Sequence, residues 1–340
     1  MNDNPRPMSI PVLNRPRVLS GMRPTGALHL GHYHGALKNW VGLQDTHEGF
    51  FFVADWHALT TQRTSGEALT RHVYEMVTDW LAAGIDPERC TLFLQSRMPE
   101  HAELFTLLAM CTPSSWLARM PSYKDQVAAD PELATYGFLG YPLLQAADIL
   151  LYKPAGVPVG EDQAAHVEVT REVARRFNRL YAEAAPIFVE PQALLTETAR
   201  VPGLDGQKMS KSLGNAIAMR DEPEVTAAKL RTMPTDPQRV RRTDAGEPAR
   251  CPVWPLHRIY SDDATRAACE AGCRTASMGC LDCKQPLIEA IQREQAPWRE
   301  RAAALDPQQV KWTLEVGTER ARAVARKTLR EVRAAMGLVA

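Results

Sequence analysis

The sequence predicts an α/β protein: a parallel-sheet, Rossmann-like nucleotide-binding domain followed by a smaller all-helical C-terminal domain. Short β-rich runs alternate with amphipathic helices as far as Ser212, which is the pattern of a parallel α/β sheet. After Ser212 strand-like runs largely disappear, and helical periodicity continues to the end. We therefore expect a catalytic domain at residues 17–212 and a helical domain at residues 213–340, whose last helix can pack back on the first.

Four short segments are the predicted strands. The first, at residues 18–20, ends in a turn that contains Gly21, Pro24 and Gly26. The others are apolar or β-branched runs at residues 50–54, 91–95 and 157–159. Their spacing leaves room for a helix between successive strands, as a parallel sheet requires.

The predicted helices each place apolar residues on one side at the helical period. Between the second and third strands these residues are Leu69, Val73, Met76 and Trp80, with Thr64 and Glu67 as a capping box and Gly84 as the stop. After the fourth strand they are Val169, Val173, Phe177 and Leu180. A last helix at residues 319–336 is expected to bury Ala325, Leu329, Val332 and Met336.

Charge and hydropathy narrow the class of protein. The chain has 40 basic and 40 acidic residues, so it is not basic overall, although basic residues cluster locally at 229–242 and 320–333. Either cluster could be an ordinary solvated helix face. No apolar run approaches the roughly 20 residues that span a bilayer, and residues 1–16 lack a signal-peptide pattern. We expect a cytoplasmic protein with no membrane partner.

The first candidate site follows the first predicted strand. The chain lacks both a Walker-type loop and a Gly-x-Gly-x-x-Gly turn, but residues 24–32 lead from a strand into a helix. Free N–H groups at such a helix start bind anions. His29 and His32 are three residues apart and project from one side, and Gly31 lets a nucleotide approach the backbone. Two surface histidines in a glycine-containing loop are the alternative.

The second candidate site is a polar loop near the predicted domain boundary. Residues 206–212 place two lysines and two serines after a glycine. Ammonium groups on such a loop would stabilise a pyrophosphate leaving group as its negative charge grows.

Together, His29-Leu30-Gly31-His32 and Lys208-Met209-Ser210-Lys211-Ser212 resemble the "HIGH" and "KMSKS" signatures of class I aminoacyl-tRNA synthetases. The resemblance implies ATP with Mg²⁺ as a substrate. It also implies catalytic roles for four residues: His29, His32, Lys208 and Lys211. Further ATP contacts are expected from Arg23, Thr25, Gly31, Gly160, Asp162, Met209 and Ser210.

A third candidate site lies in the apolar segment 138–152. Tyr141, Gln145 and Asp148 follow i, i+4, i+7 spacing and share one side of a helix. A carboxylate among apolar neighbours needs a partner, because burying it alone is costly. An indole N–H and a phenol hydroxyl both qualify, while a turn cap or a nearby Lys or Arg is the structural alternative.

This segment and residues 157–163 resemble tryptophanyl-tRNA synthetases most closely, and the similarity covers most of residues 17–212. The resemblance implies that Asp148 accepts the indole N–H and that Tyr141 and Gln163 hold the α-ammonium group. Other residues of the expected tryptophan pocket are Leu19, His57, Gln145 and Val157.

Two of these residues bear on the choice of amino acid. Gln145 is the residue that tyrosine enzymes carry, whereas Leu19 gives a phenol hydroxyl no polar partner and so favours indole. We expect a tryptophan–tRNA ligase, which makes tryptophanyl-adenylate and transfers it to tRNA(Trp). The alternatives are a tyrosyl-tRNA synthetase and a nucleotide-binding homologue that does not charge tRNA.

Cysteines are concentrated in the helical domain. Cys251, Cys273, Cys280 and Cys283 have C-x21-C-x6-C-x2-C spacing, and in a cytosolic chain such spacing indicates a metal site. Four thiolates can bind zinc, which is the more common metal at such sites, or an iron–sulfur cluster, and the spacing does not distinguish them; unliganded thiols are the remaining alternative. The pattern resembles a subgroup of tryptophanyl-tRNA synthetases with a [4Fe–4S] cluster, with Cys269 as a substitute ligand or a bystander. The resemblance also implies anticodon binding near the basic residues 229–242, and a homodimer.

Overall fold

A five-stranded parallel sheet forms the centre of the first two hundred residues. The structure, a computed structural model, describes residues 15–61, 65–195 and 201–338. Its strands are β1 (Arg17–Met22), β2 (Glu48–Val53), β3 (Cys90–Leu94), β4 (Gly156–Val159) and β5 (Gln192–Leu195), in the order β3-β2-β1-β4-β5. The four predicted strands are confirmed. The sequence analysis missed β5, because this short edge strand is mostly half-buried or exposed and lacks an apolar pattern.

The strand order sets the position of the site. β1 pairs with β2 on one side and β4 on the other, so the chain changes direction across the sheet between these strands. In open parallel sheets, ligands bind where the strand order reverses, beyond the carboxyl ends of the strands. The segments after β1 and β4, which begin at Arg23 and Gly160, leave the sheet at this edge.

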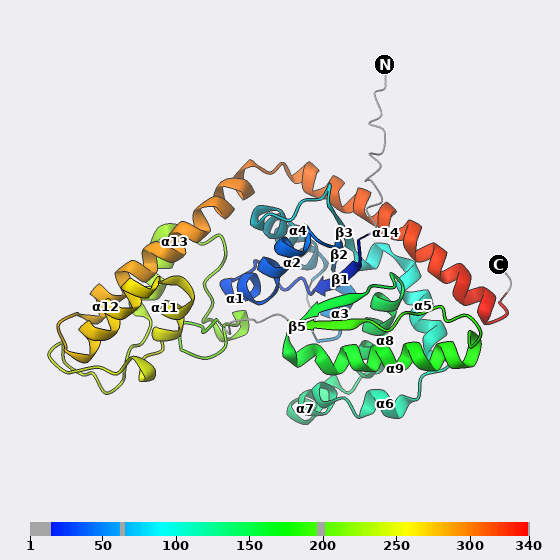
Figure 1. Ribbon diagram of the computed structural model, residues 1–340, viewed down its shortest axis with the longest axis horizontal. Coiled ribbons are helices and arrows are strands. Elements are labelled where there is room, and N and C mark those ends of the chain that lie inside the picture. Colours follow the sequence, from blue (N-terminus) through cyan, green and yellow to red (C-terminus); the bar gives the residue numbers. More distant parts are fainter. Residues whose placement is uncertain (1–14, 62–64, 196–200, 339–340) are drawn as a thin grey trace, which may run out of the picture.

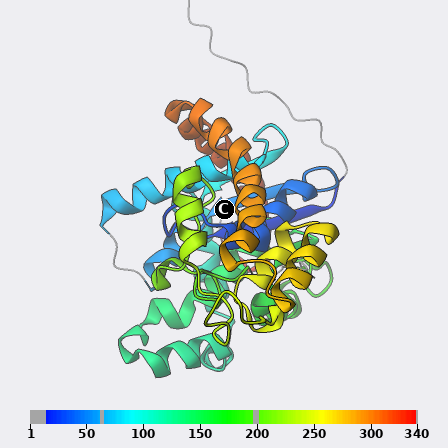
Figure 2. The same cartoon turned by 90° about the vertical axis from the view of Figure 1, so that its left-hand side faces the viewer.

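Helices cover both faces of the sheet (Figures 1 and 2). In the first two hundred residues they are α1 (Leu30–His32), α2 (Lys38–Leu43), α3 (Asp55–Leu59), α4 (Gly66–Ala83), α5 (Pro99–Ala109), α6 (Ser114–Ala118), α7 (Pro121–Ala129), α8 (Tyr136–Leu150) and α9 (Ala164–Tyr181). A π-helical turn, Tyr33–Leu37, joins α1 to α2.

Alternation along β2 divides the core into two apolar clusters. Phe51 stacks on Trp40 at a centroid distance of 4.6 Å, in the cluster that also contains α4. Its neighbours Phe50 and Phe52 point to the opposite face, where α8 and α9 pack. This arrangement follows from the two-residue period of a strand that is buried on both faces.

The individual helix predictions are mostly right. Val73, Met76 and Trp80 are buried on α4, and Gly84 ends that helix in the left-handed region with φ 110°. The N-cap is Ser65, whereas the expected cap, Thr64, lies outside the described residues. Leu180 was expected to be buried but is 48% exposed, because it lies in the last turn of α9, beyond the buried Phe177.

The C-terminal part is helical: α10 (Pro223–Thr232), α11 (Trp254–Tyr260), α12 (Asp263–Arg274), α13 (Cys280–Ala304) and α14 (Pro307–Ala335). Figure 1 shows α11 and α12 at one end of the molecule, with α13 and α14 running from there along the sheet domain. Residues 201–338 contain no further strand of the sheet. Within the described ranges, no helix has both the length and the apolar character needed to cross a membrane.

The last helix packs directly on the sheet. α14 begins at Pro307 rather than at residue 319, because Asp306 caps a start that the periodicity did not indicate. A Cβ added to Gly317 would lie 1.8 Å from the carbonyl oxygen of Leu92 in β3, so helix and strand touch there. Arg326 and Arg333, from the second basic cluster, pair with acidic residues of α5.

Candidate active site

The two histidines of the first candidate site form a compact unit at the carboxyl end of β1. The His29 and His32 rings stack at a centroid distance of 3.7 Å, and the backbone N–H of His29 donates to Nδ1 of His32 at 3.3 Å. A Cβ on Gly31 would lie 2.9 Å from the His29 ring, so a side chain at this position would displace that ring. The sequence spacing therefore correctly predicts that these histidines share one side.

Both imidazoles are neutral at physiological pH. Burial, followed by the charges of Lys211 and Lys208, lowers the pKa of His29 to about 4. Burial also lowers the pKa of His32, with His29 and the same lysines adding to the effect. Nδ1 of His29 is buried and finds no hydrogen-bond partner within the described residues. Neutral rings that carry N–H groups beside two lysines suit a polyanionic ligand.

The lysine loop lies directly against the histidine segment. Nζ of Lys211 donates to the carbonyl oxygen of Ala27 at 2.9 Å. Just after the loop, the chain exchanges backbone hydrogen bonds with the same segment: Leu30 N–H with the Ile217 oxygen at 3.0 Å, and Met219 N–H with the Leu28 oxygen at 2.8 Å. The segments that carry the two signatures are thus joined by hydrogen bonds although about 180 residues separate them.

The remaining loop residues differ in exposure. Met209 is buried in the core, Lys208 is exposed, and the Ser210 N–H donates to the Asn215 side chain at 2.7 Å. Asn215 also donates to Asp205, on the other side of the loop, at 2.7 Å. Asn215, which the sequence analysis did not single out, therefore fixes the shape of the loop.

A buried carboxylate supports both signatures. Asp79 of α4 accepts the Leu28 N–H at 2.8 Å and pairs with Arg220 at 2.5 Å. Burial lowers the pKa of Lys211 to about 8, and the negative charge of Asp79 partly opposes that shift. The sequence analysis missed Asp79, although its place three residues after Met76 puts it on the buried side of α4.

Asp148 is fully buried, with three donors around its carboxylate. His101 Nδ1 lies 2.5 Å from Oδ1, His57 Nε2 lies 2.7 Å from Oδ2, and Gln95 Nε2 lies 2.9 and 3.0 Å from the two oxygens. Burial alone would raise the pKa of Asp148, but the hydrogen bonds to His101 and His57 outweigh it and lower the pKa to about 2.

The donors around Asp148 come from three separate elements. His57 lies on α3, Gln95 follows β3 and His101 lies on α5, where its Nε2 is 2.8 Å from the Tyr152 hydroxyl. Sequence analysis placed His57 in this pocket but missed Gln95, His101 and Tyr152. Gln95 could have been found, because it leaves β3 at the same sheet edge as the other site residues.

The other predicted pocket residues lie at different depths. Leu19 and Val157 are buried in one apolar cluster, and Gln145 and Gln163 are half-buried. The Tyr141 hydroxyl contacts Ser122 Oγ at 2.5 Å and His166 Nε2 at 2.8 Å. Ser122 and His166 are two more site residues that the sequence analysis missed.

The remaining predicted ATP contacts lie at the carboxyl ends of β1 and β4. Arg23 and Thr25 follow β1, where Arg23 donates to Thr61 at 3.3 Å. Gly160 follows β4 and precedes a short 3-10 turn, Glu161–Gln163. Asp162 belongs to that turn, but its side chain lies outside the described part of the chain.

The four predicted metal ligands line a single small cavity in the helical domain. Cys251, Cys273, Cys280 and Cys283 all contribute to its wall. Burial, and then neighbouring cysteines, raises the pKa of Cys283. A second grouping shares one of them: ligand atoms of His257, Cys269 and Cys283 lie within 4.8 Å of one another. A bound cation would relieve the repulsion between neighbouring thiolates and serve as their common partner.

Comparison with known proteins assigns this chain to a family. Residues 13–294 match the family described as tRNA synthetases class I (W and Y). Tryptophan–tRNA ligase of Ralstonia nicotianae is 52% identical over 95% of this chain and 98% of that protein. The enzyme of Thermotoga maritima is 50% identical over 95% and 99%.

Solved structures agree. Tryptophanyl-tRNA synthetase from Campylobacter jejuni, complexed with ADP and tryptophan, has a TM-score of 0.85 at 33% identity, covering 95% of this chain and 100% of that one. The chain therefore belongs to the class I tRNA synthetases of the tryptophan and tyrosine group, and within that group to the tryptophan–tRNA ligase family.

Proposed function

We propose that this protein activates L-tryptophan with ATP to form tryptophanyl-adenylate and then transfers the tryptophanyl group to tRNA(Trp). The observation that carries this proposal is the set of hydrogen bonds between the segments that contain the histidine and lysine signatures, beyond the carboxyl end of β1. Relatives of about half identity over nearly full length are named tryptophan–tRNA ligases, and the Campylobacter relative binds ADP and tryptophan.

In the first step, the tryptophan carboxylate attacks the α-phosphate of Mg-ATP, and pyrophosphate leaves. The neutral imidazoles of His29 and His32 bind the phosphates by hydrogen bonds. Lys211 and Lys208 stabilise the negative charge that develops on the pyrophosphate leaving group. Catalysis comes from positioning and charge stabilisation, so no side chain acts as a covalent nucleophile. In the second step, the 2′-hydroxyl of the terminal adenosine of tRNA attacks the carbonyl carbon of the adenylate, which forms the aminoacyl ester and releases AMP.

The remaining roles complete the ATP and ammonium contacts. Arg23, Thr25, Gly31, Gly160, Asp162, Met209 and Ser210 form the rest of the ATP site, and Tyr141 and Gln163 hold the α-ammonium group. Tyr141 suits this role because its hydroxyl is already oriented by Ser122 and His166.

Asp148 is the proposed acceptor of the indole N–H. Its carboxylate already receives bonds from His57, Gln95 and His101, so one donor must yield when the substrate binds. His57 is that donor, because its side chain is 11% exposed whereas His101 is fully buried. Leu19 and Val157 form an apolar wall that offers no partner for a phenol hydroxyl. These features favour tryptophan over tyrosine, despite Gln145.

The helical domain, residues 213–340, is proposed to bind the anticodon. Its cysteine cavity would hold a [4Fe–4S] cluster through Cys251, Cys273, Cys280 and Cys283, with zinc as the alternative. The shared cavity supports this set, and Cys269 then remains a neighbour of Cys283. When bound, such a cluster would fix the surrounding loops. Lys284, which lines the cavity, donates from Nζ to the carbonyl oxygen of Met233 at 2.5 Å.

Two broader assignments follow from family membership. We propose that the enzyme is a homodimer, and that it works in the cytoplasm, where its substrates for protein synthesis are.

Charging of tRNA tests the proposal against a homologue that only binds nucleotide. We expect the purified protein to attach labelled tryptophan to a tRNA(Trp) transcript in the presence of Mg-ATP. A matched transcript of tRNA(Tyr), offered with tyrosine, is the control and should remain uncharged. Adenylate formation without any transfer to tRNA(Trp) would contradict the proposal.

A further inference from the structure

A buried chain of hydrogen bonds reaches Asp148 through the carboxylate oxygen that His57 does not contact. His101, in the first turn of α5, places Nδ1 2.5 Å from Oδ1 of Asp148 and Nε2 2.8 Å from the Tyr152 hydroxyl. All three of these side chains are fully buried. Tyr152 follows Asp148 by four residues, just beyond the end of α8, so His101 bridges two groups that are one helical turn apart.

The direction of each hydrogen bond in this chain follows from the chemistry of its groups. An ionised carboxylate can only accept, so Nδ1 of His101 carries the proton that it shares with Asp148. Burial, and then the charges of Asp148 and Glu100, raises the pKa of Tyr152, so its hydroxyl keeps its proton. A buried hydroxyl needs an acceptor, and Nε2 of His101 lies within reach. The Tyr152 hydroxyl therefore donates to Nε2 and fixes the tautomer of His101.

The other oxygen of Asp148 is the one that the substrate can reach. Gln95 donates to both oxygens of Asp148, and its own Oε1 accepts the Trp56 N–H at 3.1 Å, so the orientation of this amide is fixed. His57 bonds only to Oδ2 and is the donor proposed above to yield. Once His57 moves, His101 still occupies Oδ1, while Oδ2 keeps only the bond that it shares with Gln95. The carboxylate then has one oxygen that needs a donor.

We propose that His101 is a positioning residue for substrate specificity: it holds Asp148 so that Oδ2 accepts the indole N–H, and Tyr152 holds the imidazole of His101. The inference rests on the proposed role of Asp148 in binding tryptophan. A hydrogen bond to an ionised acceptor is about twice as strong as one between neutral groups. A ligand without an N–H group would leave that buried charge short of a donor. The pair of His101 and Tyr152 therefore sets how strongly the pocket prefers an indole to a ring of the same shape without the N–H group.

The test compares the binding of tryptophan and of L-3-benzothienylalanine to the full-length protein by isothermal titration calorimetry. In this analogue a sulfur atom replaces the indole N–H group, and the shape of the ring system is nearly the same. We expect the wild type to bind tryptophan about 10- to 100-fold more tightly than the analogue, because the analogue leaves Oδ2 of Asp148 without its donor. A wild type that binds both ligands equally, or that does not bind tryptophan, would contradict the inference.

Two substitutions of His101 separate positioning from packing. His101→Phe keeps a ring but donates nothing to Asp148, so burial raises the pKa of Asp148 with one donor fewer to oppose it. The preference for tryptophan should then fall to about threefold, the value of a hydrogen bond between neutral groups. His101→Asn keeps an N–H group near the position of Nδ1 and should retain most of the preference. If His101→Phe weakened the binding of both ligands by the same factor, or if His101→Asn lost as much preference as His101→Phe, the inference would be overturned.

Tyr152→Phe tests the second half of the chain. It removes only the hydroxyl that holds His101, and the neighbouring rings of Phe50 and Phe93 keep the site packed. The preference should fall about threefold. Thr318→Val is the matched control, because its buried hydroxyl bonds within α14, and it should keep the wild-type preference. Equal preferences in Tyr152→Phe and Thr318→Val would overturn the inference. Since this assay needs neither ATP nor tRNA, selective tryptophan binding without tRNA charging would refute the proposed function and leave this inference standing.

Discussion

At the residue scale, the buried charges define the site. The isolated position of Asp148 among apolar neighbours showed from the sequence that its carboxylate needs a partner. Of its three donors, only His57 was expected in this pocket, through the family resemblance. Gln95 and His101 come from segments that only the folded sheet brings beside Asp148. The helical period could have placed Asp79 on the buried side of α4, but not its partner Arg220, which lies 141 residues away.

Lys211 gives the sharpest prediction at this scale. Removing its ammonium group with Lys211→Ala should lower the turnover number for adenylate formation about 100-fold, because one preorganised charge is lost from the leaving group. The Kd for tryptophan should stay within about twofold, since Lys211 bonds to Ala27, next to the histidines proposed to bind ATP, and makes no hydrogen bond to Asp148 within the described residues. An unchanged turnover number would contradict the role assigned to Lys211.

The pH dependence of the reaction follows from the same residue. Burial lowers the pKa of Lys211 to about 8. As the pH rises through about 8, Lys211 therefore loses its proton and its positive charge. Turnover for pyrophosphate exchange should therefore fall on the basic side of a pH profile. Lys211→Arg keeps its positive charge at that pH, so the fall in its turnover should occur at a higher pH than in the wild type. A limb at the same pH in both proteins would assign it to another group.

At the element scale, periodicity predicted the strands and the interior of long helices well, and their ends less well. The missed β5 is a four-residue edge strand with little burial. The start of α14 depends on the Asp306 cap and not on apolar spacing. We expected from the sequence that the last helix can pack back on the sheet domain. The contact between Gly317 and β3 depends on tertiary structure and leaves no pattern in the sequence.

Gly317 tests that packing. Gly317→Ala should lower the free energy of unfolding by about 3 kcal/mol, because the new methyl group meets the Leu92 backbone, which cannot move aside. Gly42→Ala is the matched control: it lies on α2, with no atom within 4 Å of the added carbon. It should be neutral or stabilise by about 0.5–1 kcal/mol. Equal denaturation midpoints for the two variants would show that α14 does not press on β3 as described.

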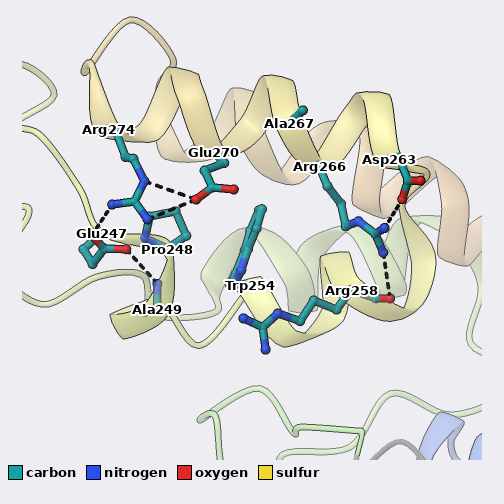
Figure 3. A pocket seen from close by; sticks show the side chains of 10 residues that line it. All are labelled: Glu247, Pro248, Ala249, Trp254, Arg258, Asp263, Arg266, Ala267, Glu270 and Arg274. Carbon is teal, nitrogen blue, oxygen red and sulfur yellow. Dashed lines mark hydrogen bonds and ion pairs between the residues drawn. The ribbon is translucent and has the colours of Figure 1, made fainter.

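At the scale of the whole molecule, contacts link the helical domain to the histidine signature. His34, two residues after His32, bonds to the Tyr260 hydroxyl at 2.8 Å and to Glu294 at 3.1 Å. Tyr260 ends α11, which begins at Trp254 in the lining of a surface cavity (Figure 3), and Glu294 lies on α13, which begins at Cys280. Two helices thus run from the cysteine region to the catalytic edge, an arrangement that sequence spacing could not indicate.

The cavity lined by the four cysteines leads to a prediction about the iron and sulfide content of the protein. Protein purified without oxygen should contain iron and acid-labile sulfide in equal amounts, with about four of each per chain. Cys280→Ser should lose most of both, whereas Cys269→Ser should keep them if Cys269 is a bystander. Zinc without iron in the wild type would contradict the [4Fe–4S] proposal and leave the four-cysteine site as a zinc site.

Amino-acid-dependent exchange of pyrophosphate into ATP tests the central claim most directly, because it depends on both signatures and on the Asp148 pocket without requiring tRNA. The wild type should exchange rapidly with tryptophan and about 10- to 100-fold more slowly, in kcat/KM, with tyrosine. A phenol hydroxyl buried against Leu19 lacks a second partner, and an unmade hydrogen bond of this kind costs about 1–3 kcal/mol. Exchange with tyrosine and none with tryptophan would contradict the account.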